Sequence, residues 1–392
     1  MLRFDEGVPP PLDQLAAFLG GERTLAETWG RPGAKVEQHI VLDSPVMGPS
    51  PSTFAIRPIP TLETTRDLCR WLGLSPGELA WFADCEGRQG QLVNPRLHHY
   101  RYKWVAKRSA EHRLLEIPKS RLKLIQRTIL RDILDAVPVH PCAHGFVRHR
   151  SCRTYAQPHV GKAAVLRMDL RHFFTHVPPP RIGAALMRLG YPYEVARVLR
   201  GLCTHSSSPA RAGPLFRTLP WALQQRLRAK HLPQGPPTSP ALANLCAWNL
   251  DRRLAGLAKR FGLDYSRYAD DLAFSGSRRL ARIANHIQAL VGAISAEEGF
   301  SINHRKTRLN TRGQTQRLAG ITVNEKINVS RTDFDLLKAT LFNCLRHGPA
   351  SQNRENHPNF RDHLAGRVAH VVSLNPRKGA RLRVILDRID WA

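Results

Sequence analysis

The middle of the chain changes between two spacings of apolar residues. Residues 163–170 are almost all apolar, which predicts a buried strand, and Asp169 lies near its end. Residues 180–190 and 192–204 place apolar side chains three or four positions apart, which predicts two amphipathic helices. Residues 263–276 are strand-like on both sides of two acidic residues, and they predict a hairpin.

Local start and stop signals predict the other elements. Ser75-Pro76 gives a hydroxyl N-cap followed by proline, which predicts a helix start. Thr238-Ser239-Pro240 carries the same signal and predicts one long helix with a hydroxyl N-cap, running through Leu257. The remaining predictions are a helix within residues 61–74, a Ser-, Pro- and Arg-rich loop at 206–219, a helix from Arg278 to about Glu298, short strands at 300–303, 308–311 and 317–323, and a helical region at 332–392.

Asp270 and Asp271 stand side by side in the predicted hairpin. Aspartate is a poor strand residue, and adjacent carboxylates repel each other. A tight turn would explain the pair, and a cap would explain Asp169. A metal site shared by all three explains both motifs with one cause, because Mg²⁺ prefers oxygen ligands. Two such ions can activate a 3′-hydroxyl and stabilise a leaving pyrophosphate.

Charge narrows the class of partner. The chain has 392 residues, with 59 Lys+Arg against 31 Asp+Glu, and a formal net charge of +28. This excess favours a polyanion, because neutralised phosphates release counterions. A membrane surface is the alternative, but the charge is spread along the chain and not held on one amphipathic helix. Nucleic acid is therefore the favoured partner. There is no signal-peptide pattern, nor an apolar run that would span a bilayer, so no membrane is expected.

The cysteines indicate a reduced setting. Their number is seven, and none forms a Cys-x-x-Cys pair, which favours the cytoplasm over a disulfide framework. His140, Cys142 and His144 are close enough in sequence to hold zinc, but no second ligand pair follows at a suitable distance.

The segment Leu232-Pro-Gln-Gly-Pro-Pro-Thr-Ser-Pro240 is the most distinctive loop. Gly235 allows the backbone to approach a ligand closely, and the helix start beyond it offers free N–H groups to an anion or a base edge. An ordinary Pro- and Gly-rich loop is the alternative.

Three motifs in this order resemble the palm of a reverse transcriptase. They are Asp169-Leu-Arg-His-Phe-Phe174, the Leu232 to Pro240 loop and Tyr268-Ala-Asp-Asp271. The resemblance extends over about residues 63–392, through Tyr100 to Arg113, His144-Gly-Phe-Val147 with Arg150-Ser151, Gly299 to Thr307 and Leu318 to Asn324. Jointly these motifs are highly specific.

Within that family the chain is similar to the compact bacterial enzymes of retrons. Residues 156–162 resemble the retron Asn-Ala-x-x-His region, with Tyr155 in place of Asn, and Leu318-Ala319-Gly320 stands where retrons have Val-Thr-Gly. Retron enzymes make a branched RNA–DNA molecule, msDNA, from their own noncoding RNA and act in anti-phage defence. The resemblance thus implies a structured noncoding RNA as template and primer, its DNA product, deoxynucleoside triphosphates, and an effector protein as a further partner.

The resemblance also implies an α+β fold in the shape of a right hand. We expect an N-terminal arm at 1–60, fingers with a helical module at 61–160, a palm at 161–330 and a helical thumb at 331–392. The palm would be a small antiparallel sheet backed by helices.

The implied site holds two Mg²⁺ ions on Asp169, Asp270, Asp271 and the carbonyl of Leu170. Lys107 and Arg113 would contact the triphosphate, unless they only line an exposed basic strand. Gln234 and Gly235 would line the nucleotide pocket, and Lys306 would protonate pyrophosphate or contact a phosphate. Phe174 would exclude ribonucleotides by clashing with a 2′-hydroxyl, unless the ring only packs in the core.

The sequence therefore predicts an RNA-directed DNA polymerase of retron type. Two rivals stay open. One is a related defence enzyme with untemplated or protein-primed DNA synthesis. The other is a nucleic-acid-binding scaffold with a vestigial polymerase site.

Overall fold

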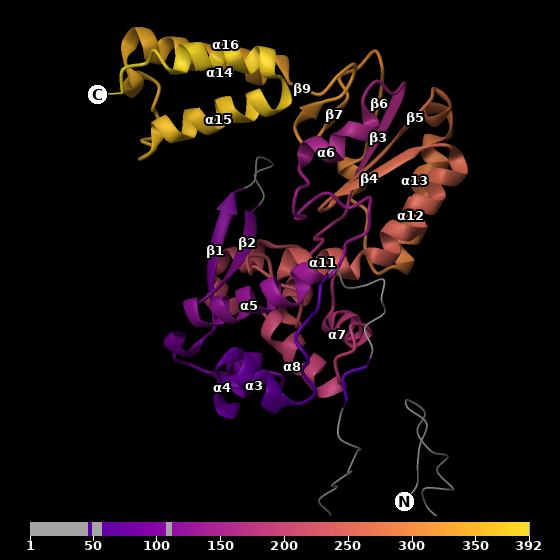
Figure 1. Ribbon diagram of the computed structural model, residues 1–392, viewed down its shortest axis with the longest axis vertical. Coiled ribbons are helices and arrows are strands. Elements are labelled where there is room, and N and C mark those ends of the chain that lie inside the picture. Colours follow the sequence, from indigo (N-terminus) through magenta and orange to yellow (C-terminus); the bar gives the residue numbers. More distant parts are fainter. Residues whose placement is uncertain (1–45, 49–56, 107–111, 392) are drawn as a thin grey trace, which may run out of the picture. The chain divides into compact units, whose positions relative to one another are not determined.

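The computed structural model describes residues 46–48, 57–106 and 112–391, which belong to one unit, Val46–Ala392. These residues form many helices and three antiparallel sheets of four, three and two strands (Figure 1). This is the α+β class that the sequence predicts. Most of the predicted arm at 1–60 lies outside the described residues. Within the described ranges, every helix is too short or too polar to cross a lipid bilayer.

The four-stranded sheet has the order β4-β5-β3-β6, with every neighbouring pair antiparallel. Its strands are β3 (Ala164–Asp169), β4 (Asp264–Tyr268), β5 (Asp271–Gly276) and β6 (Arg308–Thr311). The predicted strand at 163–170 and hairpin at 263–276 are therefore confirmed. Successive side chains of a strand point to opposite faces. Leu166 accordingly packs in one core cluster and its neighbour Val165 in another, so both faces of β3 are buried.

Helices cover both faces of this sheet. On one side lie α12 (Trp248–Phe261), which contacts β4, and α13 (Arg279–Glu297), which contacts β3, β5 and β6. On the other lie α6 (Cys152–Ala156) and the 3₁₀ turn η4 (Gln157–His159). The helix expected from Arg278 to Glu298 is confirmed as α13. Its buried residues Leu280, Ile287 and Val291 repeat at helical spacing and meet the sheet.

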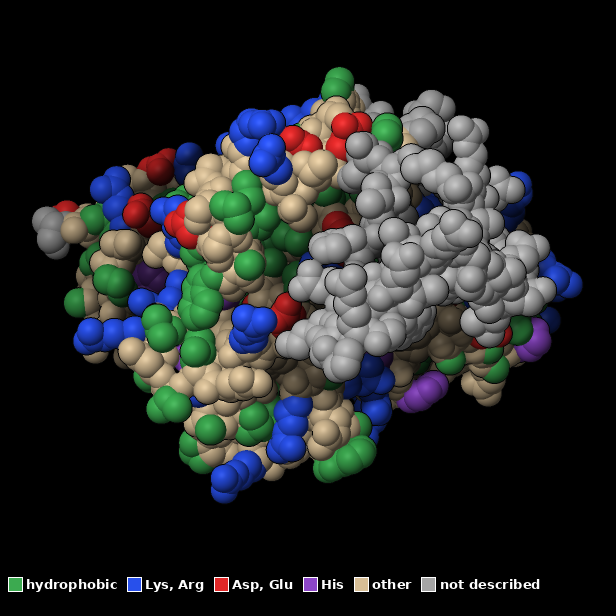
Figure 2. Space-filling model, turned by 90° about the horizontal axis from the view of Figure 1, so that it is seen from below, with side chains coloured by type: hydrophobic (Ala, Val, Ile, Leu, Met, Phe, Trp, Pro, Cys, Tyr) green, Lys and Arg blue, Asp and Glu red, His purple; other side chains and the backbone are tan. Residues whose placement is uncertain are grey.

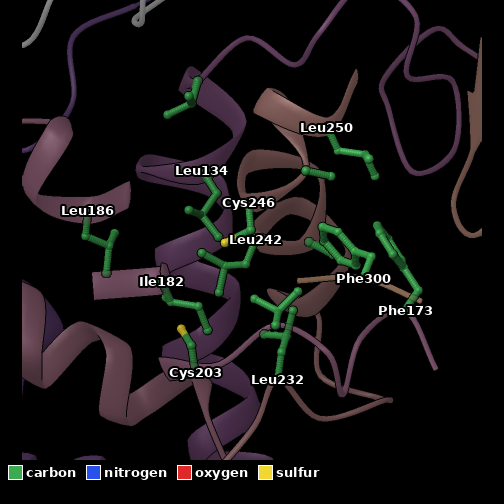
Figure 3. Packing of buried hydrophobic residues seen from close by; sticks show 14 of the residues in the cluster. Leu134, Phe173, Ile182, Leu186, Cys203, Leu232, Leu242, Cys246, Leu250 and Phe300 are labelled. Carbon is green, nitrogen blue, oxygen red and sulfur yellow. The ribbon is translucent and has the colours of Figure 1, made fainter. Parts of the chain in front are cut away.

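A helical core continues from the sheet (Figure 3). It is formed by α5 (Ser120–Asp132), α7 (Pro179–Arg188), α8 (Tyr193–Cys203), α11 (Ser239–Cys246) and the 3₁₀ turn η3 (Leu134–Ala136). Ile182 and Leu186 of α7 point toward Leu242 and Cys246 of α11 in Figure 3, and all four are buried. The two amphipathic helices predicted at 180–190 and 192–204 are thus α7 and α8.

Two short helices pack on α8: α3 (Thr65–Leu72) and α4 (Pro76–Ala83). Thr64 and Ser75 each form a capping box, in which the N-cap hydroxyl accepts from the third helical amide and that residue's carboxylate accepts from the cap amide. The predicted start at Ser75-Pro76 is confirmed. Two 3₁₀ turns, η1 (Arg88–Gln91) and η2 (Pro95–Leu97), lead to the antiparallel pair β1 (Tyr100–Ala106) and β2 (His112–Pro118).

The last part of the chain has its own core. The strands β7 (Arg317–Leu318), β8 (Ile321–Thr322) and β9 (Asn328–Val329) form a small sheet, followed by α14 (Arg331–His347), η7 (Pro349–Ser351), α15 (Phe360–Leu374) and α16 (Pro376–Leu386). Leu318, Leu337, Val368 and Leu382 pack together in one buried cluster. The predicted helical region at 332–392 is confirmed as three helices.

The long helix predicted through Leu257 is wrong. It is two helices, α11 and α12, separated at Ala247, whose backbone leaves the helical region (φ −89°, ψ 3°). The break lets α11 pack on α7 while α12 packs on α13 and β4. The expected hydroxyl cap is also wrong. Thr238 already has helical dihedrals (φ −77°, ψ −26°), and its side chain makes no capping hydrogen bond.

Three other predictions need correction. The loop at 206–219 contains α9 (Pro209–Ala212) and η5 (Pro214–Thr218), and α10 (Trp221–Arg228) follows it, because Phe216 and Leu227 bury themselves against Leu114 of β2. Residues 300–303 are not a strand of a sheet, because they form a single antiparallel bridge, between Ile302 and Leu170 just beyond β3. The strand at 317–323 is a tight hairpin, reversed by positive φ at Ala319 and Gly320.

Candidate active site

The four-stranded sheet gathers three carboxylates at one edge. Asp169 ends β3 and Asp271 begins β5, and the strand register places them directly opposite each other. Asp270 lies just before Asp271, in the turn after β4, and its carbonyl accepts a 2.8 Å hydrogen bond from the amide of Leu170. Two motifs about a hundred residues apart in the sequence therefore meet, as the sequence predicts. Leu170 itself is buried beside them.

Negative charge is concentrated at this edge. Burial, together with the charges of Asp271 and Asp169, raises the pKa of Asp270 to about 6. Burial also raises the pKa of Asp271, although the guanidinium of Arg167 opposes that shift. Nε and Nη2 of Arg167 donate to Asp271 Oδ1 at 3.0 and 2.8 Å. Lys306, in the 3₁₀ turn η6 (His304–Lys306), places its Nζ 2.7 Å from Asp169 Oδ1.

The chemistry of these donors suits a divalent cation, since carboxylate oxygens are the hard ligands that Mg²⁺ prefers. Among the residues that the structure describes, no three His, Cys, Asp or Glu side chains are already arranged around one metal position. Two of the three carboxylates here are held by Arg167 and Lys306. A metal ion at this edge would therefore compete with Lys306 for Asp169.

The same observation gives no support to zinc at His140, Cys142 and His144. His144 Nδ1 instead forms a 3.0 Å hydrogen bond with the hydroxyl of Thr154, and burial lowers the pKa of His144 to about 4. The backbone of this segment has a different role, because it lies against the acidic turn.

The turn between β4 and β5 is held from two sides. Ala269 has a φ of 55°, in the left-handed region that costs an L-residue about 1–2 kcal/mol. Nη1 of Arg267 donates to the Ala269 carbonyl at 3.1 Å. Gly145 approaches so closely that a Cβ there would lie 2.5 Å from the Ala269 nitrogen. Only glycine fits at position 145 without moving the turn that carries Asp270.

A fully buried ion pair supports the same turn. Nη2 of Arg267 lies 2.6 Å from Oδ2 of Asp251 on α12, and both side chains are 0% exposed. Asn244 of α11 joins them, since it accepts from Arg267 Nη1 at 3.0 Å and donates to the Gly145 carbonyl at 2.9 Å. Sequence reasoning missed Arg267, Asp251 and Arg167. The available signal was an arginine inside the mostly apolar strand at 163–170 and another three residues before Asp270.

Phe174 is half-buried on an aromatic support. Its ring centroid lies 5.7 Å from that of Phe173 and 6.0 Å from that of Phe146. Phe173 in turn stacks on Phe300, and the two rings lie side by side in Figure 3. Phe173 is the core residue of the pair, so the neighbouring Phe174 is the ring that is left partly accessible.

Gly235 packs closely against strand β2. Its φ is 146°, and a Cβ there would lie 2.5 Å from the carbonyl oxygen of Glu116. The close backbone approach that the structure shows at Gly235 is therefore to strand β2. The adjacent Gln234 is half-buried, and its backbone also hydrogen-bonds to Glu116. The place of both residues in a nucleotide pocket stays a prediction.

One of the two predicted triphosphate contacts lies on the β1–β2 pair. Arg113 is exposed on β2, opposite Val105 of β1. Lys107 lies outside the described residues. Their roles stay predictions.

Comparison with known proteins identifies the family. A model of the family "Reverse transcriptase (RNA-dependent DNA polymerase)" matches residues 105–338. The chain is 40% identical to the retron Mx65 reverse transcriptase of Myxococcus xanthus over 335 residues, which cover 85% of this chain and 74% of that protein. It is 32% identical to the retron Mx162 reverse transcriptase of Myxococcus xanthus over 347 residues, 84% of this chain and 67% of that protein. It is 28% identical to the retron Ec86 reverse transcriptase of Escherichia coli over 294 residues, 74% of this chain and 81% of that protein. The chain therefore belongs to the retron-type reverse transcriptases, RNA-directed DNA polymerases that copy RNA into DNA from deoxynucleoside triphosphates and depend on divalent metal ions.

Proposed function

We propose that this enzyme makes retron msDNA by copying a structured noncoding RNA, and that Asp169, Asp270 and Asp271 are its catalytic residues. The observation that carries the proposal is the meeting of these carboxylates at one edge of the sheet, through the Asp169–Asp271 register and the Leu170–Asp270 hydrogen bond. A divalent cation would relieve the repulsion between three adjacent carboxylates, and nucleotidyl transfer uses such a cation.

In this proposal the right-hand parts follow the observed elements. The four-stranded sheet with α12 and α13 is the palm, the β1–β2 pair and its neighbouring helices belong to the fingers, and α14 to α16 form the thumb. The bounds that we propose are those expected from the sequence: 61–160, 161–330 and 331–392.

The three carboxylates and the Leu170 carbonyl would hold two Mg²⁺ ions. When bound, such ions lower the pKa of the attacking hydroxyl and neutralise charge on the leaving pyrophosphate. The contact between Lys306 and Asp169 supports a role for this lysine at the metal site, where it would hold a leaving phosphate group and donate a proton or a hydrogen bond to it. Arg167 holds the Asp271 carboxylate in one orientation.

The incoming nucleotide would lie beside these carboxylates. Arg113 and Lys107 would contact its triphosphate, and Gln234 and Gly235 would line its pocket. Phe174 would stand under the sugar and reject a 2′-hydroxyl, and its ring has the accessibility that this role requires.

The RNA partner is supported by charge. The formal net charge is +28, and Lys and Arg side chains are spread over the face shown in Figure 2. Neutralised phosphates release counterions, so such a surface binds a folded RNA at many points. By its family we further propose that the enzyme works in anti-phage defence together with an effector protein.

Asp270→Asn tests the catalytic assignment. We expect primer extension by the purified protein to fall by about a thousandfold or more, since several kcal/mol of metal-dependent stabilisation is lost. Binding of the RNA should be retained. The matched control is Asp264→Asn, at the other end of β4, where the aspartate pairs with Lys162. Full primer extension by Asp270→Asn would contradict the assignment of Asp270 as a catalytic residue.

Sequencing the nucleic acid that copurifies with the chain tests the retron assignment. We expect a short DNA joined to a structured RNA by a 2′–5′ branch. Random cellular RNA without a branch would contradict it. DNA whose sequence matches no template would instead point to untemplated or protein-primed synthesis.

A further inference from the structure

A buried ion pair lies between β2 and the loop before α11. Nε2 of His231 is 3.0 Å from Oε2 of Glu116, and the two side chains are 2% and 1% exposed. Burial opposes the charge on His231, but the Glu116 carboxylate outweighs it and raises the pKa of His231. Glu116 likewise has a pKa of about 2 in spite of its burial, because His231 stabilises its charge. Each group therefore stabilises the charged form of the other.

The carboxylate of Glu116 accepts two further hydrogen bonds. The hydroxyl of Ser207 donates to Oε1 at 2.6 Å, and the amide of Gln234 donates to Oε2 at 3.2 Å. The backbone of Glu116 adds a third link to the loop, since its amide donates to the Gln234 carbonyl at 2.8 Å. Gln234 is therefore held at both its N–H and its C=O by one residue of β2.

Gly235 completes this contact. It packs so closely against the Glu116 carbonyl that a Cβ there would lie at 2.5 Å. This contact prevents the loop from moving toward β2, and the hydrogen bonds to Glu116 prevent it from moving away. Glu116 lies three residues after Arg113 on the same strand. Glu116 thus fixes the distance between strand β2, which carries Arg113, and the loop that carries Gln234 and Gly235. Arg113 is a predicted triphosphate contact, and the loop is part of the predicted nucleotide pocket.

We propose that Glu116 is a positioning residue for the incoming nucleotide, which acts by holding Gln234 and Gly235 in register with β2. The inference rests on the proposed function, in which these residues bind the nucleotide. A carboxylate is required because it accepts from three donors at once: Ser207, His231 and Gln234. Glutamine at this position has a single acceptor oxygen, so at least one buried donor would lose its partner.

A merely structural role makes a different prediction. Buried ion pairs often contribute little net stability, and their loss lowers the amount of folded protein. Fewer folded molecules reduce the apparent kcat and leave the KM for nucleotide unchanged. If the Gln234–Gly235 loop is displaced instead, the KM for nucleotide rises in molecules that are folded and otherwise active.

The test measures KM for deoxynucleoside triphosphate and kcat of the 392-residue enzyme on a fixed RNA template and primer. The amplitude of the initial burst gives the fraction of enzyme molecules that are catalytically active. We expect Glu116→Gln to raise KM by about tenfold or more, and to change kcat per competent molecule only a few-fold. Ser207→Ala removes one of the three donors and should raise KM by a smaller factor. The matched control is Ser295→Ala, a buried serine on α13, for which KM should not change.

A double variant tests the coupling. If Glu116 acts through Gln234, then adding Glu116→Gln to Gln234→Ala should raise KM by less than the product of the two single effects. Unchanged KM in Glu116→Gln, when Gln234→Ala alone raises it, would overturn the inference and leave the proposed function standing. If Gln234→Ala also leaves KM unchanged, the nucleotide pocket itself is misassigned. Should Glu116→Gln fail to fold, Ser207→Ala decides, and a KM equal to that of Ser295→Ala would overturn the inference.

Discussion

Phe174 owes its expected role to the rings around it. Phe173 is buried and stacked on Phe300, and Phe146 lies on the accessible side. The neighbouring rings restrict how far Phe174 can turn away from a ligand. A side chain that cannot move aside discriminates by steric clash, whereas a mobile one would give way.

Phe174→Ala should therefore admit ribonucleotides. We expect the ratio of kcat/KM for deoxynucleotides over ribonucleotides to fall by about tenfold or more, because the clash with the 2′-hydroxyl is removed. Single-nucleotide incorporation with each sugar measures it. Tyr193→Ala, at an exposed ring on α8, is the control and should keep the selectivity. Unchanged selectivity in Phe174→Ala would show that the ring only packs.

The acidic residues could be predicted because their chemistry is visible in the sequence itself. Two aspartates in an apolar hairpin require an explanation, and a metal site supplies one. Arg267 and Glu116 were missed because a charged residue in a strand is usually taken to face solvent. Their partners, Asp251 and His231, lie 16 and 115 residues away along the chain, and no local pattern connects them.

At the scale of elements, the segment around Gly145 functions as a support for the β4–β5 hairpin. Ala143 forms a bridge with Arg267, and the His144 amide donates to the Arg267 carbonyl at 2.7 Å. Gly145 then passes beneath Ala269. This segment, which the sequence linked only to the fingers, therefore determines the position of the acidic turn.

Gly145→Ala should displace that turn. The added methyl group would meet backbone atoms, which yield less readily than a flexible side chain, so we expect a loss of about 2 kcal/mol in the free energy of unfolding. Polymerase activity should fall by about a hundredfold, since small misplacements of reacting groups are costly.

Urea denaturation and primer extension measure both effects. The control is Gly256→Ala on α12, where nothing lies within 4 Å and alanine favours the helix. Equal behaviour of the two variants would contradict the supporting role.

Helix starts were predictable where the signal was local, as in the capping boxes of Thr64 and Ser75. The break at Ala247 was not, because neither glycine nor proline marks it. Packing of α11 and α12 on different neighbours produces it. The helical turns at 209–218 were not predictable for the same reason, since the burial of Phe216 against β2 orders them.

In the whole molecule, several buried histidines are neutral. His159 is the clearest: its ring nitrogens form 2.7 Å hydrogen bonds with Ser275 and Ser266, one on each strand of the hairpin. Burial lowers its pKa to about 4. Burial also lowers the pKa of His99 to about 4. These groups make the fold sensitive to acid.

Stability should fall as the pH drops from about 6.5 to 4. In that window the unfolded chain binds a proton at His159 that the folded chain does not, so the free energy of unfolding decreases with decreasing pH. The full difference for His159 is about 3 kcal/mol. Urea midpoints at pH 7 and 4.5 measure it. His159→Gln should flatten the dependence, while His347→Gln, at an exposed site on α14, should not. An unchanged slope in His159→Gln would contradict the assignment.

The two buried faces of β3 determine how the protein can be divided. Val165 and Ala273 of the large sheet, with Tyr155, complete the cluster that α14 to α16 bury. A fragment that begins after β6 would therefore expose Leu318, Leu337 and Val368, and the other fragment would expose the opposite half of the same surface. Neither piece is self-sufficient. A split enzyme should regain its structure only by fragment complementation, when both pieces are produced together.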